Sequence, residues 1–344
     1  MKVARTLAAC VVAGGLAATV LSGPAQAGTG AASAGGRDAA AAGEAIRYAW
    51  VDECPKKGST VPCGAWTLNL RSGRKVVLGD AVVFPREPGG GVDRENSAPL
   101  AVSGDGSRLV YFRKSDGRLV WNRAAGGKAR ALPGGAGRVP KGIGMGDVNP
   151  TLSHDGTVLV IDYTDEAGKL PTLAVDLTAG DVERLPGGDA VQGLSPDGRQ
   201  VLTSRFTEDN TTAFSVYGID GSTGESREVP QVVSNNAPVA LADDGVTVGV
   251  VIFSTSGKPR LRQYDLSTDA VSPAVEMGLA GNELPYHLMW TRSGALTLWS
   301  LRLDAAGDFS HAVARGVNPS TGGLKKADSF RLRAGVWAWW LPGE

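Results

Sequence analysis

Five short segments of this 344-residue chain share one pattern, a Ser-x-Asp-Gly turn or an eroded copy of it followed by a short apolar run. The segments are residues 103–106, 153–156, 195–198, 242–245 and 291–294. Their closing glycines lie 50, 42, 47 and 49 residues apart. A period of this length filled with short strands is typical of propeller blades. The repeat therefore predicts an all-β fold, although such a fold alone specifies no function.

A second turn recurs out of phase with the first, after an apolar strand. It occurs six times, at residues 69–73, 122–126, 176–180, 220–224, 265–269 and 318–322. Its Asp, Asn, Ser and Gly residues provide the side-chain hydrogen bonds and positive φ angles that tight hairpins require.

The mismatch between five turns of one kind and six of the other predicts how the ring closes. If the first turn joins strands A and B of a blade and the second joins C and D, the first blade begins at strand B, over residues 46–51. Residues 336–340 are then left over at the other end of the chain. We predict a six-bladed β-propeller in which this C-terminal strand completes the first blade and removes the open sheet edges.

The best copy of the repeat carries a family resemblance. Ser195-Pro196-Asp197-Gly198, followed by Arg199 and an apolar strand, resembles the WD-repeat-like repeat of TolB-type six-bladed propellers. Similar repeats form the propeller of prolyl-oligopeptidase-type enzymes. The resemblance covers about residues 44–344 and implies the fold. TolB also has an N-terminal α/β domain, where this chain is expected to have only a linker, so the lipoprotein partner of TolB is not implied for this chain.

The N-terminal segment predicts export. Lys2 and Arg5 precede an apolar stretch over residues 7–21, and Ala25-Gln26-Ala27 is a small-x-small cleavage site. We expect a signal peptide at 1–27, a flexible Gly/Ala linker at 28–43 and the propeller at 44–344. Cys10 mimics a lipoprotein box, but almost no apolar sequence precedes it. We therefore expect a secreted, extracytoplasmic protein.

The charge balance limits the partners. Without residues 1–27 the chain has 33 basic and 35 acidic residues, a net charge of −2. A near-neutral surface argues against nucleic acid and anionic membranes as main partners. After cleavage the sequence contains no second apolar stretch long enough to span a membrane. We expect a monomer whose partner is an extracellular or cell-envelope protein or peptide.

Two cysteines remain after cleavage, Cys54 and Cys63. An even pair in an exported protein predicts a disulfide, in this chain closing a hairpin loop with Pro55 and Pro62 just inside it and Gly58 between them. A metal site is the alternative, but two thiols provide too few ligands.

Loop length predicts where a binding site lies. The A–B and C–D turns share one face, and the B–C and D–A connections share the other, which we call the long-loop face. That face has long irregular segments at residues 84–98, 133–149, 164–171, 208–212 and 276–283, and the disulfide loop at residues 54–63 belongs to it too. Long loops on a rigid ring are where binding residues usually lie, although they can also be tolerated insertions.

Polar residues gather on the long-loop face just before the A strands. They are Asn96, Asn149, Asp189, Asn236 and Glu283. We predict that they ring the mouth of the central channel, where their oxygens could bind a polar ligand or a calcium ion. The alternative is that Asn and Asp are simply common in loops.

The sequence gives little support for a catalytic function. The chain has no Gly-x-Ser-x-Gly elbow, no phosphate-binding loop and no His-Glu-x-x-His pair. Its three histidines, His154, His287 and His311, share no spacing. The repeated aspartates recur with the turn, so we interpret them as structural. Trp337, Trp339 and Trp340 in the closing strand are expected to pack between blades rather than to bind sugars.

We therefore expect a non-catalytic propeller that binds a protein, peptide or cell-envelope ligand on its long-loop face. The alternative is a cation-assisted hydrolase of the lactonase or glycosidase type, with its site at the channel mouth.

The export signal gives the first testable prediction. Cleavage after Ala27 should leave a secreted protein that starts at Gly28, since the residues before the cleavage site are small. N-terminal sequencing of secreted material checks this. A start at a lipid-modified Cys10 would contradict it.

Overall fold

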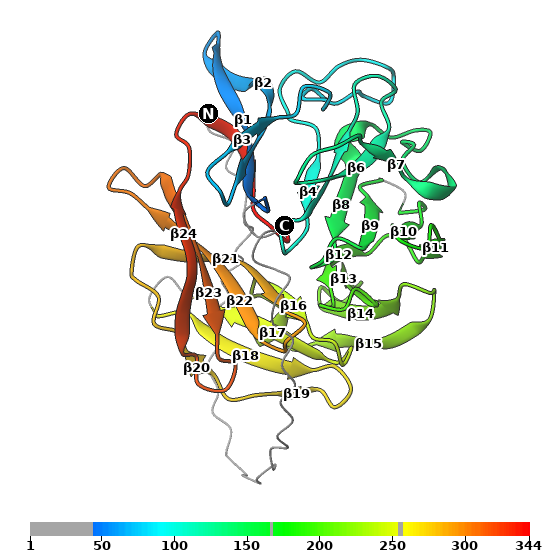
Figure 1. The fold of residues 1–344 in the computed structure, drawn as a ribbon. Coiled ribbons are helices and arrows are strands. Elements are labelled where there is room, and N and C mark those ends of the chain that lie inside the picture. The colour runs from blue at the N-terminus through cyan, green and yellow to red at the C-terminus, as the bar shows by residue number, and fades with distance from the viewer. Residues whose placement is uncertain (1–43, 166–167, 254–256) are drawn as a thin grey trace.

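Within the residues that the computed structural model describes (44–165, 168–253 and 257–344), the strands form six antiparallel sheets arranged as a ring (Figure 1). The predicted signal peptide and linker lie outside the described residues. Each sheet is one blade, and its first strand lies innermost. The six-bladed β-propeller predicted from the repeats is confirmed. Among the residues described, no helix has the length and apolar character needed to cross a membrane.

In the first three blades the strands follow one another from the innermost outward. Blade 1 comprises β25 (Val336–Trp340), β1 (Ile46–Lys56), β2 (Ser59–Leu70) and β3 (Lys75–Val77). Blade 2 comprises β4 (Leu100–Val102), β5 (Arg108–Phe112), β6 (Leu119–Arg123) and β7 (Arg130–Ala131). Blade 3 comprises β8 (Val148–Leu152), β9 (Val158–Tyr163), β10 (Thr172–Asp176) and β11 (Val182–Leu185).

The other three blades follow the same order. Blade 4 comprises β12 (Ala190–Leu194), β13 (Gln200–Phe206), β14 (Thr212–Gly218) and β15 (Thr223–Val229). Blade 5 comprises β16 (Val239–Leu241), β17 (Thr247–Ile252), β18 (Arg260–Asp265) and β19 (Ala270–Val271), with β20 (Val275–Glu276) also paired to β18. Blade 6 comprises β21 (Glu283–Trp290), β22 (Leu296–Leu303), β23 (Phe309–Val317) and β24 (Leu324–Arg331). A short helix, α2 (Gln231–Ser234), precedes β16.

The C-terminal strand closes the ring, as predicted. β25 pairs antiparallel with β1, with Trp340 opposite Ala49 and Trp339 opposite Trp50. Trp337 and Trp340 pack on the apolar cluster shared by blades 1 and 2, whereas Trp339 packs on the cluster of blade 6. The three rings are half-buried. They therefore join the first blade to both of its neighbours, which confirms the packing interpretation.

Each well-kept Ser-x-Asp-Gly turn is held by the same three hydrogen bonds. In blade 4 the Ser195 hydroxyl donates to Asp197 Oδ1 (2.7 Å) and accepts from the Gln200 amide (3.0 Å), while the Arg199 amide donates to Asp197 Oδ1 (2.9 Å). Ser195 is fully buried. Blades 2 and 3 repeat this arrangement at residues 103–108 and 153–158. The structural role inferred for the repeated aspartates is confirmed.

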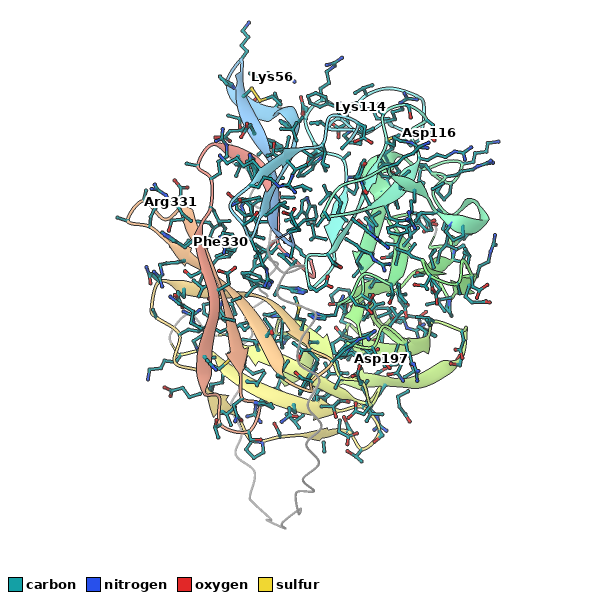
Figure 2. All side chains as sticks on the ribbon, viewed as in Figure 1. Lys56, Lys114, Asp116, Asp197, Phe330 and Arg331 are labelled. Atoms are coloured by element: carbon teal, nitrogen blue, oxygen red, sulfur yellow. A yellow bond between two sulfur atoms is a disulfide. The ribbon has the colours of Figure 1, made fainter. Side chains whose placement is uncertain are left out.

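The disulfide between Cys54 and Cys63 is present, with the two Cα atoms 5.8 Å apart. The segment between the two cysteines is a regular β-hairpin in which Cys54 lies opposite Val61, in agreement with the hairpin loop expected from the sequence. The hairpin extends past the last residue of β1 that pairs with β25, Asp52. Pro55 and Pro62 are tolerated there because the hairpin has a free edge. Figure 2 shows this disulfide in the hairpin that projects beside Lys56.

The serine of the repeat turn gives a stability prediction. Ser195→Ala removes the donor to Asp197 and leaves the Gln200 amide without its side-chain acceptor. We expect a loss of about 1–3 kcal/mol of unfolding free energy, the usual cost of unsatisfied buried polar groups. Urea denaturation measures it. Ser320→Ala, at an exposed position of a C–D turn, is the control and should leave the midpoint unchanged. Equal behaviour of the two variants would contradict the role of the turn.

Candidate functional site

The two longest connections of the long-loop face are ordered and joined to each other. The Met145 amide donates to the Arg86 carbonyl (2.8 Å), which links the segment after β7 to the segment after β3. The segment after β3 is also tied to blade 2, because the Lys114 amide donates to the Asp80 carbonyl (2.7 Å). These segments therefore form one continuous surface over blades 1 to 3 rather than separate mobile insertions.

The disulfide hairpin extends this surface. The Lys56 ammonium lies 3.1 Å from the Glu95 carboxylate, which belongs to the connection after β3. Both side chains are exposed, so this pair contributes little stability. It does place the hairpin tip beside the longest connection.

Three phenylalanines are exposed at the B–C connections of three consecutive blades. Phe206 ends β13 and is 85% exposed, Phe253 directly follows β17 and is 41% exposed, and Phe309 begins β23 and is 46% exposed. All three lie on the long-loop face because B–C connections share that face. Large apolar side chains exposed on one face of a protein are typical of an interaction surface. We call these three residues the phenylalanine arc.

The five predicted mouth residues do lie before or at the start of the inner strands of blades 2 to 6. Each is bonded within its own region. Their partners are Asp93 for Asn96, Thr164 for Asn149, Thr203 for Asp189, the Val232 carbonyl and Phe253 amide for Asn236, and Arg302 and Arg315 for Glu283. Among the described residues, no two of these five hydrogen-bond to each other. That they bind a ligand together stays a prediction.

Glu283 is the most strongly held of the five. Its carboxylate is fully buried and pairs with the Arg302 guanidinium (2.7 Å) and the Arg315 guanidinium (2.6 Å). Arg315 also donates to Ser300 Oγ (2.6 Å). Burial alone would raise the pKa of Glu283, but hydrogen bonds from Arg302 and Arg315 outweigh it and lower the pKa. A carboxylate neutralised by two arginines is a poor ligand for a cation.

The arrangement of potential metal ligands gives no further support to the calcium hypothesis. Across residues 44–165, 168–253 and 257–344, no three His, Cys, Asp or Glu side chains are grouped closely enough to hold a metal ion. Asp189 and Glu283 are the carboxylates among the five, and each binds partners of its own blade.

One side chain crosses the central channel at the face of the short turns. Arg292, at the A–B turn of blade 6, forms an ion pair with Asp155 in the turn of blade 3 and donates to the Pro196 carbonyl of blade 4 (3.4 Å). Blades 3 and 6 are opposite each other in a ring of six, so this side chain crosses the axis. Gly343 also enters here, since its amide donates to the Val102 carbonyl of blade 2 (2.9 Å).

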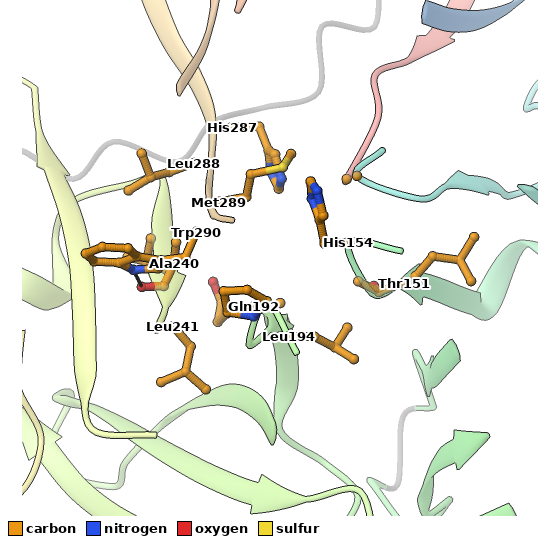
Figure 3. A pocket seen from close by; sticks show the side chains of 16 residues that line it. Thr151, His154, Gln192, Leu194, Ala240, Leu241, His287, Leu288, Met289 and Trp290 are labelled. Carbon is orange, nitrogen blue, oxygen red and sulfur yellow. Dashed lines mark hydrogen bonds between the residues drawn. The ribbon is translucent and has the colours of Figure 1, made fainter. Parts of the chain in front are cut away.

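A small cavity of about 40 Å³ lies beneath this crossing, lined by the inner strands and their turns (Figure 3). Its polar side chains include His154, His287 and Gln192, and Met289 lines it beside them. Burial of the His287 imidazole lowers its pKa to about 4, so it is neutral at pH 7. A neighbouring cavity of about 280 Å³ shares His154 and Met289 and extends to Trp299 and Asp328 of blade 6.

Sequence reasoning missed these channel residues. His154 occupies the variable position of a Ser-x-Asp-Gly turn, and that position faces the axis rather than the solvent. The signal was available in His287-Leu288-Met289, where alternate residues of an inner strand share one side.

No family model and no curated protein matches this chain. Solved structures do resemble it. TolB from Acinetobacter baumannii is 12% identical, with 86% of this chain and 82% of that chain covered and a TM-score of 0.44. A functionally unknown protein from Desulfotomaculum acetoxidans is 14% identical, with coverages of 83% and 80% and a TM-score of 0.43.

A puromycin hydrolase is 19% identical, with a TM-score of 0.45. The match covers 83% of this chain but only 46% of the hydrolase. The solved structures similar to this chain thus include TolB proteins, as the repeat resemblance predicted. The six-bladed fold itself follows from the strand pairing.

The Glu283 cluster gives a prediction for stability and pH. Glu283→Gln removes the counter-charge of Arg302 and Arg315, and we expect a loss of about 3 kcal/mol of unfolding free energy. Because the pKa of Glu283 is lowered in the folded state, the contribution is present at neutral pH. It is lost as the pH falls below the ordinary value of 4.5 and through the lowered pKa.

Denaturation of wild type and variant from pH 3 to pH 7 measures this difference. The difference between the two curves should narrow toward the acidic end, because the pKa of Glu283 is lowered in the folded state. Glu276→Gln is the control, because the Lys258–Glu276 pair is exposed and its loss should not move the midpoint. A difference between wild type and Glu283→Gln that stays constant with pH would contradict the assignment.

Proposed function

We propose that this chain is a secreted, non-catalytic propeller that binds a protein or peptide of the cell envelope or its surroundings on the long-loop face. The observation that carries the proposal is the phenylalanine arc, which presents three large apolar side chains on one face of blades 4 to 6. Aromatic side chains are enriched in protein interfaces, and burying each contributes about 1.5–3 kcal/mol.

Two further features support this proposal. The joined connections over blades 1 to 3 give the same face an ordered, charged region beside the arc, and such a polar rim is typical of protein interfaces. The disulfide between Cys54 and Cys63 suits the oxidising compartments outside the cytoplasm. The hydrolase alternative requires a cation at the channel mouth, and the pairing of Glu283 with two arginines does not favour it.

The phenylalanine arc can be tested directly. Immobilised wild-type protein and a variant with Phe206→Ser, Phe253→Ser and Phe309→Ser are exposed to culture supernatant and cell-wall extract of the producing organism. We expect proteins captured by the wild type to be lost with the triple variant, because the apolar contacts of the interface are gone. Melting temperatures should agree, since these side chains are exposed.

The matched control is Val77→Ser. Val77 is 63% exposed but belongs to the outermost strand of blade 1. This variant should capture the same proteins as the wild type. Capture that is unchanged in the triple variant, or lost equally in Val77→Ser, would show that the arc is not the binding surface.

A further inference from the structure

The side chains of β21 point alternately to the two sides of the strand, and those of one side line the channel. Leu288 and Trp290 pack in the apolar cluster between blades 5 and 6. His287 and Met289 lie on the other side of the strand, where Met289 packs with the cluster of blades 6 and 1. One inner strand therefore presents an imidazole and a thioether, two residues apart, to the small channel cavity.

Gly343 lies against both of these groups. A Cβ atom placed on Gly343 would lie 3.2 Å from His287 Nε2 and 3.3 Å from Met289 Sδ. Both ligand-type atoms therefore border the point where that Cβ would lie. Only a residue without a side chain leaves that point open, because the same Cβ would collide with the Met289 methyl group.

His154 reaches the cavity from the turn of blade 3. Its Nδ1 atom is buried and has no hydrogen-bond partner in the described part of the chain. Gly104 makes room for it, since a Cβ there would lie 2.5 Å from Nδ1. Figure 3 shows the imidazoles of His154 and His287 turned toward each other, with the Met289 sulfur beside them. A buried nitrogen without a partner calls for a ligand or an ordered water.

We propose that the channel cavity binds a single Cu(I) ion through the imidazoles of His154 and His287 and the thioether of Met289. Thioether sulfur is a soft ligand that selects Cu(I), whereas hard cations such as calcium and magnesium take oxygen ligands. A cavity of about 40 Å³ has room for an ion or a water molecule. The ring of inner strands holds the ligands in place before the metal arrives.

This site is independent of the partner surface proposed above. It lies at the short-turn end of the channel, whereas the phenylalanine arc lies on the opposite face. The proposed ligands come from the A–B turn of blade 3 and the inner strand of blade 6, and none belongs to the arc. Either proposal can fail without the other.

Anaerobic titration of the purified full chain with Cu(I), in competition with bicinchoninate, tests the proposal. We expect one Cu(I) per chain. Met289→Leu keeps the side-chain volume but removes sulfur, and His287→Gln removes the imidazole. Loss of a ligand should weaken Cu(I) binding at least as much as loss of an outer partner, roughly 10–100-fold. Binding of Zn(II) should be weaker than that of Cu(I) and unaffected by Met289→Leu.

The third histidine provides the matched control. His311 lies in β23 and contacts Ser310 Oγ, away from the cavity lining. His311→Gln should bind Cu(I) like the wild type. Gly104→Ala changes no proposed ligand but crowds His154, so it should weaken binding even if the ligand variants fold poorly. Melting curves without metal identify any variant that is unfolded.

Two outcomes would overturn the proposal. The first is a wild-type protein that does not compete with bicinchoninate for Cu(I), which would leave an ordered water as the occupant of the cavity. The second is Cu(I) binding that is equal in the wild type, Met289→Leu and Gly104→Ala, which would place the metal elsewhere. X-ray absorption spectra at the copper edge should show nitrogen and sulfur atoms bound to copper in the wild type and nitrogen atoms alone in Met289→Leu.

Discussion

The hydrogen-bonded pair of serine and aspartate in the A–B turns is the interaction on which the rest of the ring depends. In each of blades 2 to 4, one buried hydroxyl donates to the aspartate and accepts the amide that starts strand B. The turn nearest the axis is therefore fixed in every one of these blades. In blades 5 and 6, where the Ser-x-Asp-Gly pattern is incomplete, other side chains hold the turn. Asp244 accepts hydrogen bonds from the Val246 and Thr247 amides, and the Thr291 hydroxyl hydrogen-bonds to the Ala295 backbone.

This turn also determines which residues face the axis. In the well-kept turns of blades 2 to 4, the serine and aspartate are hydrogen-bonded within the turn and the glycine has a positive φ, so the second position is the one that varies. Three residues at that position, Gly104, His154 and Pro196, line the small cavity, and Arg292 at the same position crosses above it. The second position of the structural repeat therefore determines which side chain each of these turns places at the channel.

The fold could be predicted from the sequence because it follows from local chemistry. Turn residues, β-branched strands and the unmatched strand at the C-terminus predicted six blades and their closure, and both are confirmed. The site could not be predicted in the same way. A bulge between Pro285 and His287 shifts the register of β21, so the side that His287 faces cannot be found by counting from the strand's start. The pairing of Glu283 with Arg302 and Arg315 depends on two other strands of its sheet.

The crossing of Arg292 to Asp155 links two blades that share no sheet edge. Arg292 also donates to the Pro196 carbonyl, so the turn of blade 6 contacts both blade 3 and blade 4. The opposite sides of the ring are therefore connected directly across the axis as well as through the blades between them.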